Sequence, residues 1–404
     1  MNSLQKITII SLCCFGLPSA EVAAQWSNMS SGITDGITSI CSPSPDTAYA
    51  VSTAFANGGK IIATKNGTNW NQQFSSPKYL LTVFFRSANL GWAGGGIIPG
   101  GIILKTTDGG NKWDTMTTSL FQIYSIHFIN DTLGWAIGND ATQGSCYIYH
   151  STDGGLNWSQ QFSGFDYLRN IHFTSPLIGY AAGDNGRIFK TIDGGLNWLL
   201  LSTGVVFHFS DVEFVSDSIG WAVGSYVTGG CYHTTDGGAS WNAQNLPFST
   251  PLRSVSFVSP NTGWICGENG KVLMTTNAGT NWTAQNVPVT INLNSIHLSD
   301  PGNGYAAGET GSIIKYENST SAIHETTLNA IQAFPIPTSG ELFITAPENF
   351  LNNDYIISDC SGRIVFKGQL TGNNNRIDIS LLANGIYFLK SDMQTNARLK
   401  IIKN

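Results

Sequence analysis

The chain has 404 residues, too many for one small domain, and charged residues make up only 11% of it, against about a quarter in ordinary soluble proteins. Because 41% of the residues are hydrophobic and 11% aromatic, wholesale disorder is excluded. The net charge of −6 provides no basic excess for neutralising phosphates, so nucleic acid is not expected as a partner. Gly, Asn, Ser and Thr are abundant where a helical protein would use Ala, Leu, Glu and Lys, which predicts an all-β fold.

Residues 1–24 have the features of a cleaved signal peptide. A lysine-bearing start precedes a short apolar run over 7–17, and the Val-Ala-Ala of 22–24 is a small-x-small cleavage pattern. Neither this run nor any later stretch is long enough for a membrane-spanning helix. A lipoprotein is the alternative because of Cys13 and Cys14, but the small residue expected before a lipobox cysteine is missing.

The cysteines that follow this segment predict neither a zinc site nor a dense disulfide framework. They form no CxxC pair and have no regular spacing, and their odd number leaves at least one unpaired. We expect buried structural thiols. The five are Cys41, Cys146, Cys231, Cys266 and Cys360.

One phrase recurs along the chain: a hydroxyl residue, then Asp-Gly-Gly, then Trp. A degenerate copy ends at Trp70, and five steps over the 212 residues from Trp70 to Trp282 give a mean period of 42.4 residues. A second phrase, Gly-Trp-Ala or Gly-Tyr-Ala in most copies, lies between the copies of the first, from Gly91 to Gly304. A period of 40 to 45 residues with short alternating strands is typical of four-stranded β-propeller blades.

Seven such units predict a seven-bladed β-propeller over residues 25–316. The seventh unit stops at Tyr316 without its Trp strand, and Trp26 lies 44 residues before Trp70, where it can supply that strand. The N-terminal strand would then close the ring and remove its free edges. The first strands of the units contain Ile40, Val83, Ile126, Ile171, Val212, Val255 and Ile296.

The Asp-Gly-Gly phrase itself is predicted to be a structural turn. Its Asp accepts backbone N–H groups, the hydroxyl ahead of it caps the same loop, and its Gly residues adopt left-handed dihedrals. Its Trp is expected to pack between neighbouring blades. These structural residues are Asp108, Asp153, Asp193, Asp236 and Asn277, with Trp113, Trp158, Trp198, Trp241 and Trp282.

The Ser/Thr-x-Asp-x-Gly-x-x-Trp phrase is similar to the Asp-box of bacterial neuraminidase repeats. Its alternation with Gly-Trp-Ala-x-Gly over residues 26–316 resembles the photosystem II assembly/stability factor family of seven-bladed propellers. The resemblance implies a protein-binding scaffold, and it implies no activity, because Asp-boxes are structural turns remote from any active site.

After a polar linker over 317–329, residues 330–404 alternate short strands with Gly/Asn turns, which predicts a small β-sandwich. Three motifs in this segment resemble the type A C-terminal sorting domain of the type IX secretion system: the Pro-x-Pro-Thr-x-Gly opening, the Asp-x-x-Gly hairpin and the Gly-x-Tyr-Phe strand. The opening departs from the family at Ile336, where the family usually has Asn. That resemblance implies export across the outer membrane and a secreted or cell-surface propeller.

A candidate binding face lies where the first strands of the blades begin. Arg169 and Arg253 occupy the same repeat position there, with Tyr124 as their counterpart in the third blade, and Tyr79 and Tyr167 lie nearby in the sequence. Arg and Tyr are favoured anchors at interfaces. Structural or solvated roles for these five residues are the alternative.

Three histidines and one glutamate share another repeat position. They are His127, His172, His297 and Glu213. We expect no metal site from them, because symmetric positions in a wide ring would stand too far apart to reach one ion.

A glycoside hydrolase of sialidase or xyloglucanase type is the alternative function. The propeller has four arginines, enough for a sialidase triad, but no Phe/Tyr-Arg-Ile-Pro phrase opens the chain. Asp184, Glu268 and Glu309 recur at one turn, which indicates turn chemistry rather than a catalytic pair. The sequence therefore predicts a non-enzymatic, monomeric scaffold without cofactor that binds protein or glycan and uses the type IX machinery through residues 330–404.

Overall fold

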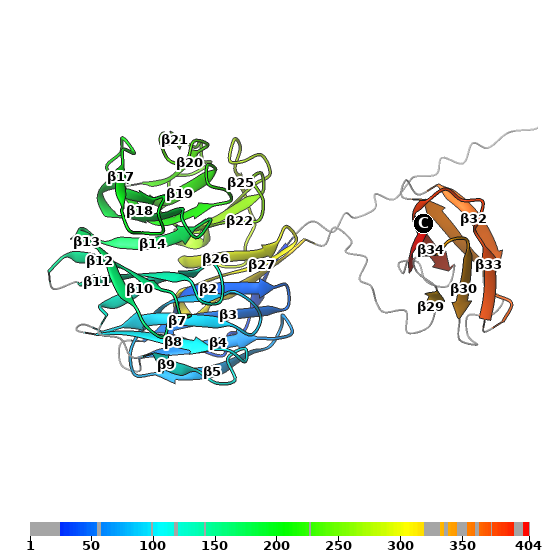
Figure 1. Ribbon diagram of the computed structural model, residues 1–404, viewed down its shortest axis with the longest axis horizontal. Coiled ribbons are helices and arrows are strands. Elements are labelled where there is room, and N and C mark those ends of the chain that lie inside the picture. Colours follow the sequence, from blue (N-terminus) through cyan, green and yellow to red (C-terminus); the bar gives the residue numbers. More distant parts are fainter. Residues whose placement is uncertain are drawn as a thin grey trace, which may run out of the picture. The chain divides into compact units, whose positions relative to one another are not determined.

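The computed structural model describes residues 25–54, 58–97, 100–116, 120–140, 143–225, 228–318, 332–334, 338–345, 354–359, 363–372, 374–391 and 399–403 (Figure 1). The candidate signal peptide, most of the expected linker and Cys360 lie outside these residues. The chain divides into two compact units, Ala24–Asn318 and the part from Ser319 to Asn404.

The first unit consists of four-stranded antiparallel sheets, and no α-helix occurs in the described residues. In sheet order its strands are β2 (Gly36–Ser44), β3 (Thr47–Thr53), β4 (Gly59–Thr64), β5 (Trp70–Ser76); β6 (Leu80–Phe85), β7 (Gly91–Gly96), β8 (Gly101–Thr106), β9 (Asp114–Met116); β10 (Gln122–Phe128), β11 (Gly134–Asp140), β12 (Ser145–Ser151), β13 (Ser159–Phe165). The next sheets are β14 (Leu168–Phe173), β15 (Gly179–Gly183), β16 (Ile188–Thr191), β17 (Leu199–Leu201); β18 (His208–Phe214), β19 (Gly220–Ser225), β20 (Gly229–Thr234), β21 (Asn242–Ala243); β22 (Leu252–Phe257), β23 (Gly263–Gly267), β24 (Val272–Thr275), β25 (Thr283–Ala284). A further sheet has the order β1 (Gln25–Met29), β28 (Ile313–Glu317), β27 (Asn303–Gly308), β26 (Leu293–Asp300).

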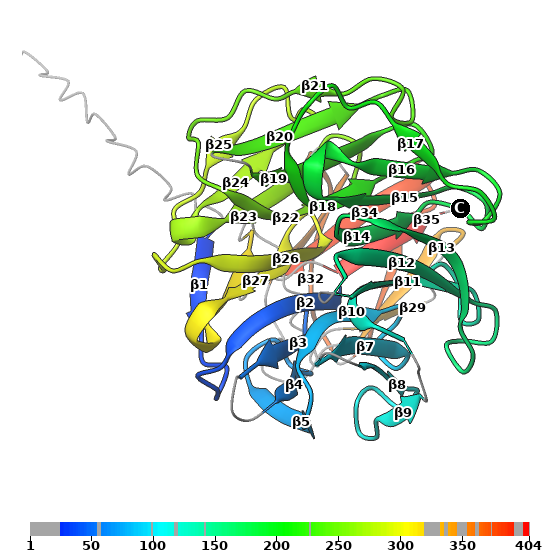
Figure 2. The same cartoon turned by 90° about the vertical axis from the view of Figure 1, so that its left-hand side faces the viewer.

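The first strands of the sheets, β2, β6, β10, β14, β18, β22 and β26, gather in the middle of the unit (Figure 2). Each lies next to the following one, and β26 lies next to β2. Along each of these strands, side chains that pack between neighbouring sheets alternate with side chains that face the middle of the unit. This alternation is expected because successive side chains of a strand point to opposite faces. The second strands carry the Gly-Trp-Ala phrase, and each lies between the first and third strands of its sheet. Their Trp92, Trp135 and Trp221 side chains are fully buried.

The N-terminal strand and the C-terminal part of this unit share one sheet. Strand β1 pairs antiparallel with β28, with Trp26 opposite Tyr316. The backbone N–H of Ile40 donates to Ser295 Oγ at 3.1 Å, and that of Ser42 donates to His297 Nδ1 at 3.2 Å. Residues more than 250 positions apart are thereby joined by hydrogen bonds.

The Asp-Gly-Gly turns are held by a repeated set of hydrogen bonds. In one of them Gly155 N–H donates to Ser151 Oγ at 2.8 Å, and Asn157 N–H donates to Asp153 Oδ1 at 2.9 Å. Gly154 and Gly155 have φ angles of 74° and 88°, where a side chain would be strained. The turn is also anchored from the preceding sheet, because the indole Nε1–H of Trp92 donates to the Gly154 carbonyl at 3.0 Å.

Replacing Asp153 by alanine should lower the free energy of unfolding by about 1 kcal/mol, because the turn loses several capping hydrogen bonds. Asp153→Asn is the matched control and should lose less. Asn277 stands at the corresponding place in another sheet and accepts the same bond from Asn281 N–H, at 2.9 Å. Urea denaturation followed by tryptophan fluorescence measures both, and equal losses in the two variants would contradict this role of the carboxylate oxygens.

The second unit contains two antiparallel sheets. Their strands are β29 (Gln332–Phe334), β30 (Glu341–Thr345) and β33 (Asn374–Asp378), and β32 (Ile364–Gln369), β31 (Asp354–Asp359), β34 (Gly385–Ser391) and β35 (Leu399–Lys403). Leu342 and Ile377 of one sheet and Ile357 and Leu389 of the other lie in one buried cluster. The sheets therefore share a core, as alternating strands predict.

Candidate functional site

Two of the predicted binding residues, Arg169 and Arg253, line one pocket of about 300 Å³. They begin strands β14 and β22, and strand β18 lies between these two in the middle of the unit. The other lining residues are Asp184, His208, Ser210, Ser225, Leu252 and Glu268.

Each arginine of this pocket is held by a carboxylate from its own sheet. Arg169 Nε donates to Asp184 Oδ1 at 2.7 Å and Nη2 to Oδ2 at 3.2 Å, while Arg253 Nη2 donates to Glu268 Oε1 at 2.6 Å. In both pairs the acid follows the arginine by 15 residues. This constant spacing is a sequence signal for the pairing that the repeat analysis missed.

The two acids lie in short 3₁₀ turns that follow the second strands, η1 (Asp184–Gly186) and η2 (Glu268–Gly270). Asn185 and Asn269 in these turns have φ angles of 59° and 56°, a left-handed conformation that Asn tolerates better than most residues. The turn chemistry expected from the sequence is therefore present. It also places both carboxylates against the arginines.

His208 is a second partner of Asp184. Its Nδ1 lies 3.2 Å from the same Oδ1 that accepts the Arg169 bond. A guanidinium has five N–H donors, and the Asp184 pair occupies two of those on Arg169. The pocket therefore offers donors and acceptors side by side, which suits the amide and carboxylate groups of a peptide.

The three predicted tyrosines do not line this pocket. Tyr124 is partly buried, which raises the pKa of its hydroxyl, and the nearby Arg169 opposes that rise. The Tyr167 carbonyl accepts the backbone N–H of Asp184 at 2.9 Å, and the Tyr79 carbonyl accepts that of Gly96 at 2.9 Å. Tyr124 and Tyr167 therefore lie beside the pocket, whereas Tyr79 belongs to the β6–β9 sheet.

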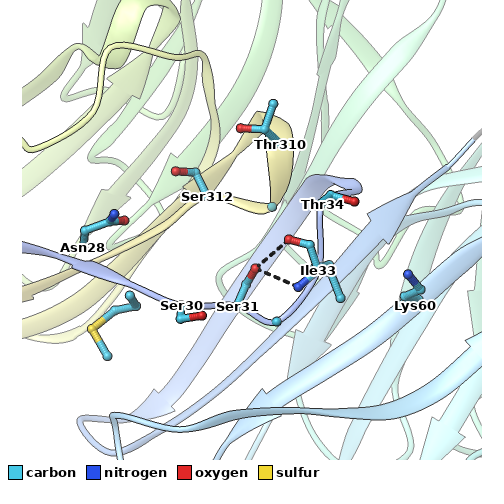
Figure 3. Close-up of a pocket in the computed structure, with 11 residues that line it drawn as sticks. Asn28, Ser30, Ser31, Ile33, Thr34, Lys60, Thr310 and Ser312 are labelled. Atoms are coloured by element: carbon cyan, nitrogen blue, oxygen red, sulfur yellow. Dashed lines mark hydrogen bonds between the residues drawn. The ribbon is translucent and has the colours of Figure 1, made fainter.

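A second polar pocket of about 430 Å³ surrounds the third turn of this kind, η3 (Glu309–Gly311) (Figure 3). Asn28, Thr310, Ser312 and Lys60 contribute to its wall. The Ser31 hydroxyl is held by Ile33, whose carbonyl accepts its proton at 3.1 Å (Figure 3). Lys60 is paired with Asp35 at 2.6 Å. The pocket lacks an aromatic platform and a free charge among its described lining residues, so it is the weaker candidate.

A cavity of about 240 Å³ lies where the innermost strands meet, and two positions of every such strand line it. The first set is Ser39, Thr82, Ser125, Asn170, Asp211, Ser254 and Ser295; the second is Cys41, Phe84, His127, His172, Glu213, Ser256 and His297. Several of these side chains accept a backbone N–H from the next innermost strand, as Glu213 Oε2 does from Phe257 at 2.9 Å.

Burial dominates the titration of these groups. It raises the pKa of Asp211 to about 6 and that of Glu213 well above its ordinary value, where the Asp211 charge adds to the rise. Burial lowers the pKa of His172 and of His297 to about 4. The imidazoles are therefore neutral at pH 7, and polar side chains of the innermost strands line much of the cavity.

The spacing argument applied to the histidines is wrong for adjacent strands. The rings of His127 and His172 lie 4.8 Å apart between centroids, because neighbouring innermost strands are in direct contact. Even so, no group of three or more His, Cys, Asp or Glu side chains that could hold a metal ion occurs in the described part of the chain. The His127 ring accepts a backbone N–H group instead, from Phe173 to Nδ1 at 3.4 Å.

Comparison with known proteins agrees with this geometry. Residues 197–289 match the model of the photosynthesis system II assembly factor YCF48, and residues 332–404 match that of the secretion system C-terminal sorting domain. No curated protein sequence matches the chain.

Three solved structures illustrate the likeness of fold. YCF48 bound to a D1 peptide is 19% identical with a TM-score of 0.59, over 72% of this chain and 96% of that one. YCF48 from Cyanidioschyzon merolae is 16% identical with a TM-score of 0.59, over 73% and 99%. The Niastella koreensis GH74 enzyme is 13% identical with a TM-score of 0.55, over 93% and 73%.

The first unit is thus an all-β protein of the propeller class. Its repeats resemble those of the photosystem II assembly factor YCF48, whose model matches residues 197–289, and the second unit is a C-terminal sorting domain of the type IX secretion system. The sorting domain makes the protein a secreted or cell-surface one. Among the described residues no helix is long and apolar enough to cross a membrane.

Proposed function

We propose that this protein is a non-enzymatic binding scaffold, a closed seven-bladed propeller that takes a protein segment at the pocket of Arg169 and Arg253. The pairing of Trp26 with Tyr316 and the bonds from Ile40 and Ser42 to the last sheet support the closure. A signal peptide at residues 1–24 completes the proposed export route.

One observation carries the binding proposal. Two arginines from different repeats meet in one pocket, each oriented by a carboxylate and each with donors left for a ligand. Alternating donors and acceptors match a peptide backbone, and the structurally similar YCF48 is seen bound to a D1 peptide.

The experiment is a synthetic peptide array and a glycan array probed with the purified full chain. The combined substitution of Arg169→Gln and Arg253→Gln should weaken binding of the selected peptide at least about tenfold, as expected for interface arginines. Arg86→Gln is the matched control, since Arg86 is also ion-paired, with Asp131 at 3.3 Å, but lies outside the pocket.

Other outcomes would replace this proposal. Binding that is equally weakened by Arg86→Gln, or that appears only on the glycan array, would contradict peptide recognition at this pocket. A glycoside hydrolase is the alternative, and turnover of chromogenic glycosides lost on Asp184→Asn or Glu268→Gln would establish it.

A further inference from the structure

The β14–β17 sheet exposes a group of large apolar side chains, which we call the β17 patch. It consists of Leu177, Ile192, Leu196, Leu199 and Leu200, each between 47% and 74% exposed. Four of them lie within nine residues of one another, and Gly194 N–H donates to the Leu177 carbonyl at 2.9 Å, which brings Leu177 to the same turn. Single exposed leucines are ordinary, whereas a contiguous group of them marks an interaction surface.

The other repeats show that the fold does not require these apolar residues. The residue after the Asp-box Trp is Leu199 here, and elsewhere it is polar: Asn71, Asp114, Ser159, Asn242 and Thr283. The residue before the Asp is Ile192 here and Thr in the other copies: Thr107, Thr152, Thr235 and Thr276. Ile192 and Leu199 are therefore particular to this sheet, and the requirements of the turn do not explain them.

Strand β17 also ends its sheet. Leu199, Leu200 and Leu201 pair with β16 on one side, and no other described strand pairs with them on the other (Figure 2). Proteins usually protect such an edge with charge, proline or a very short strand. Strand β9 begins with Asp114, and β21 and β25 have two residues each. The longer outer strands β5 and β13 are uncharged but polar at most positions, whereas β17 is Leu-Leu-Leu.

A second copy of the chain fits this edge. When β17 pairs antiparallel with itself about a two-fold axis, Leu200 faces Leu200 and Leu199 faces Leu201, so no polar group is mismatched. The β17 patch contains no charge that would repel its copy. Its exposed area is on the order of 600 Å² per copy, close to the lower bound for a stable interface.

We propose that the protein forms a two-fold dimer through the β17 patch, with strand β17 of each copy pairing with the other. This surface is separate from the arginine pocket, and the dimer goes beyond the binding function proposed above. It is an alternative to the monomer expected from the sequence.

Sedimentation-velocity ultracentrifugation of the full chain over a concentration series tests the proposal. The wild type should dimerise, and the combined substitution of Leu199→Asn and Leu200→Ala, which copies strand β21, should raise the dimer dissociation constant at least about tenfold. Leu200→Lys is an independent second variant, because a charge on an edge strand blocks pairing.

Leu156→Asn is the matched control, since Leu156 is 55% exposed in the neighbouring β10–β13 sheet and its counterpart Asn111 is polar. This variant should dimerise as the wild type does. A wild type that stays monomeric at every concentration, including one that binds lipid vesicles or an extended apolar peptide instead, would overturn the proposal. A dimer that persists in both β17 variants would do the same.

Discussion

Replacing Trp26 by alanine should lower the free energy of unfolding of the propeller unit by about 3–5 kcal/mol, the usual loss for a buried aromatic side chain. Trp26 is 2% exposed and its ring lies 5.2 Å from that of Tyr316. Strand β1 is also the only described strand that pairs with the outer edge of β28. Urea denaturation followed by tryptophan fluorescence measures the loss, because all 11 tryptophans lie between residues 26 and 282.

Trp26→Phe is the matched control. The indole Nε1 of Trp26 has no hydrogen-bond partner among the described residues, so this variant loses volume but no bond. Its expected loss is about 1.5 kcal/mol or less. If Trp26→Ala unfolded at the wild-type urea concentration, β1 would contribute nothing to the sheet and the proposed closure would fail.

Much of the fold could be predicted from the sequence because the same turn and strand patterns occur in every repeat. The Asp-Gly-Gly turn fixes two backbone conformations, and the alternation of Val255 and Phe257 with polar residues fixes which face of a strand is buried. The repeat patterns do not predict which residues of neighbouring sheets contact each other. The bond from Trp92 to the turn at Gly154 spans 62 residues, and only the packed structure places these two groups together.

The candidate site was predictable in part. Arg169 and Arg253 share a repeat position, so the sequence indicates that both lie at the same end of the unit. In the strand between them, Ser210 stands at the position that the arginines occupy in their own strands. His208, two residues earlier in that strand, also lines the pocket. Its approach to Asp184 depends on the curvature and spacing of three sheets, which no local pattern encodes.

The distance between the histidines at their shared repeat position was predicted wrongly. The expectation of a wide ring assumed that equivalent side chains are always remote, yet adjacent innermost strands bring His127 and His172 into contact. The same contact explains why polar residues are used there. Each innermost strand presents backbone N–H groups to its neighbour, and a histidine, serine or carboxylate can accept them.

Replacing Glu213 by glutamine should stabilise the propeller unit by about 2 kcal/mol or more at pH 8, because a buried carboxylate is costly to ionise. The pKa of Glu213 is raised in the folded protein, first by burial and then by Asp211. The folded state therefore keeps a proton that the unfolded state has released. Stability from this group is complete below the ordinary glutamate pKa and is lost as the pH rises through the raised value.

Glutamine can accept the same N–H from Phe257, so the substitution removes the charge and keeps the bond. At pH 4 the glutamate is mostly protonated in both states, and the two proteins should unfold at nearly the same urea concentration. Glu268→Gln is the matched control and should not stabilise at pH 8, since Glu268 is partly exposed and paired with Arg253 at 2.6 Å. An equal gain for Glu213→Gln at pH 4 and pH 8 would mean that shape rather than charge is responsible, and the buried-acid explanation would fall.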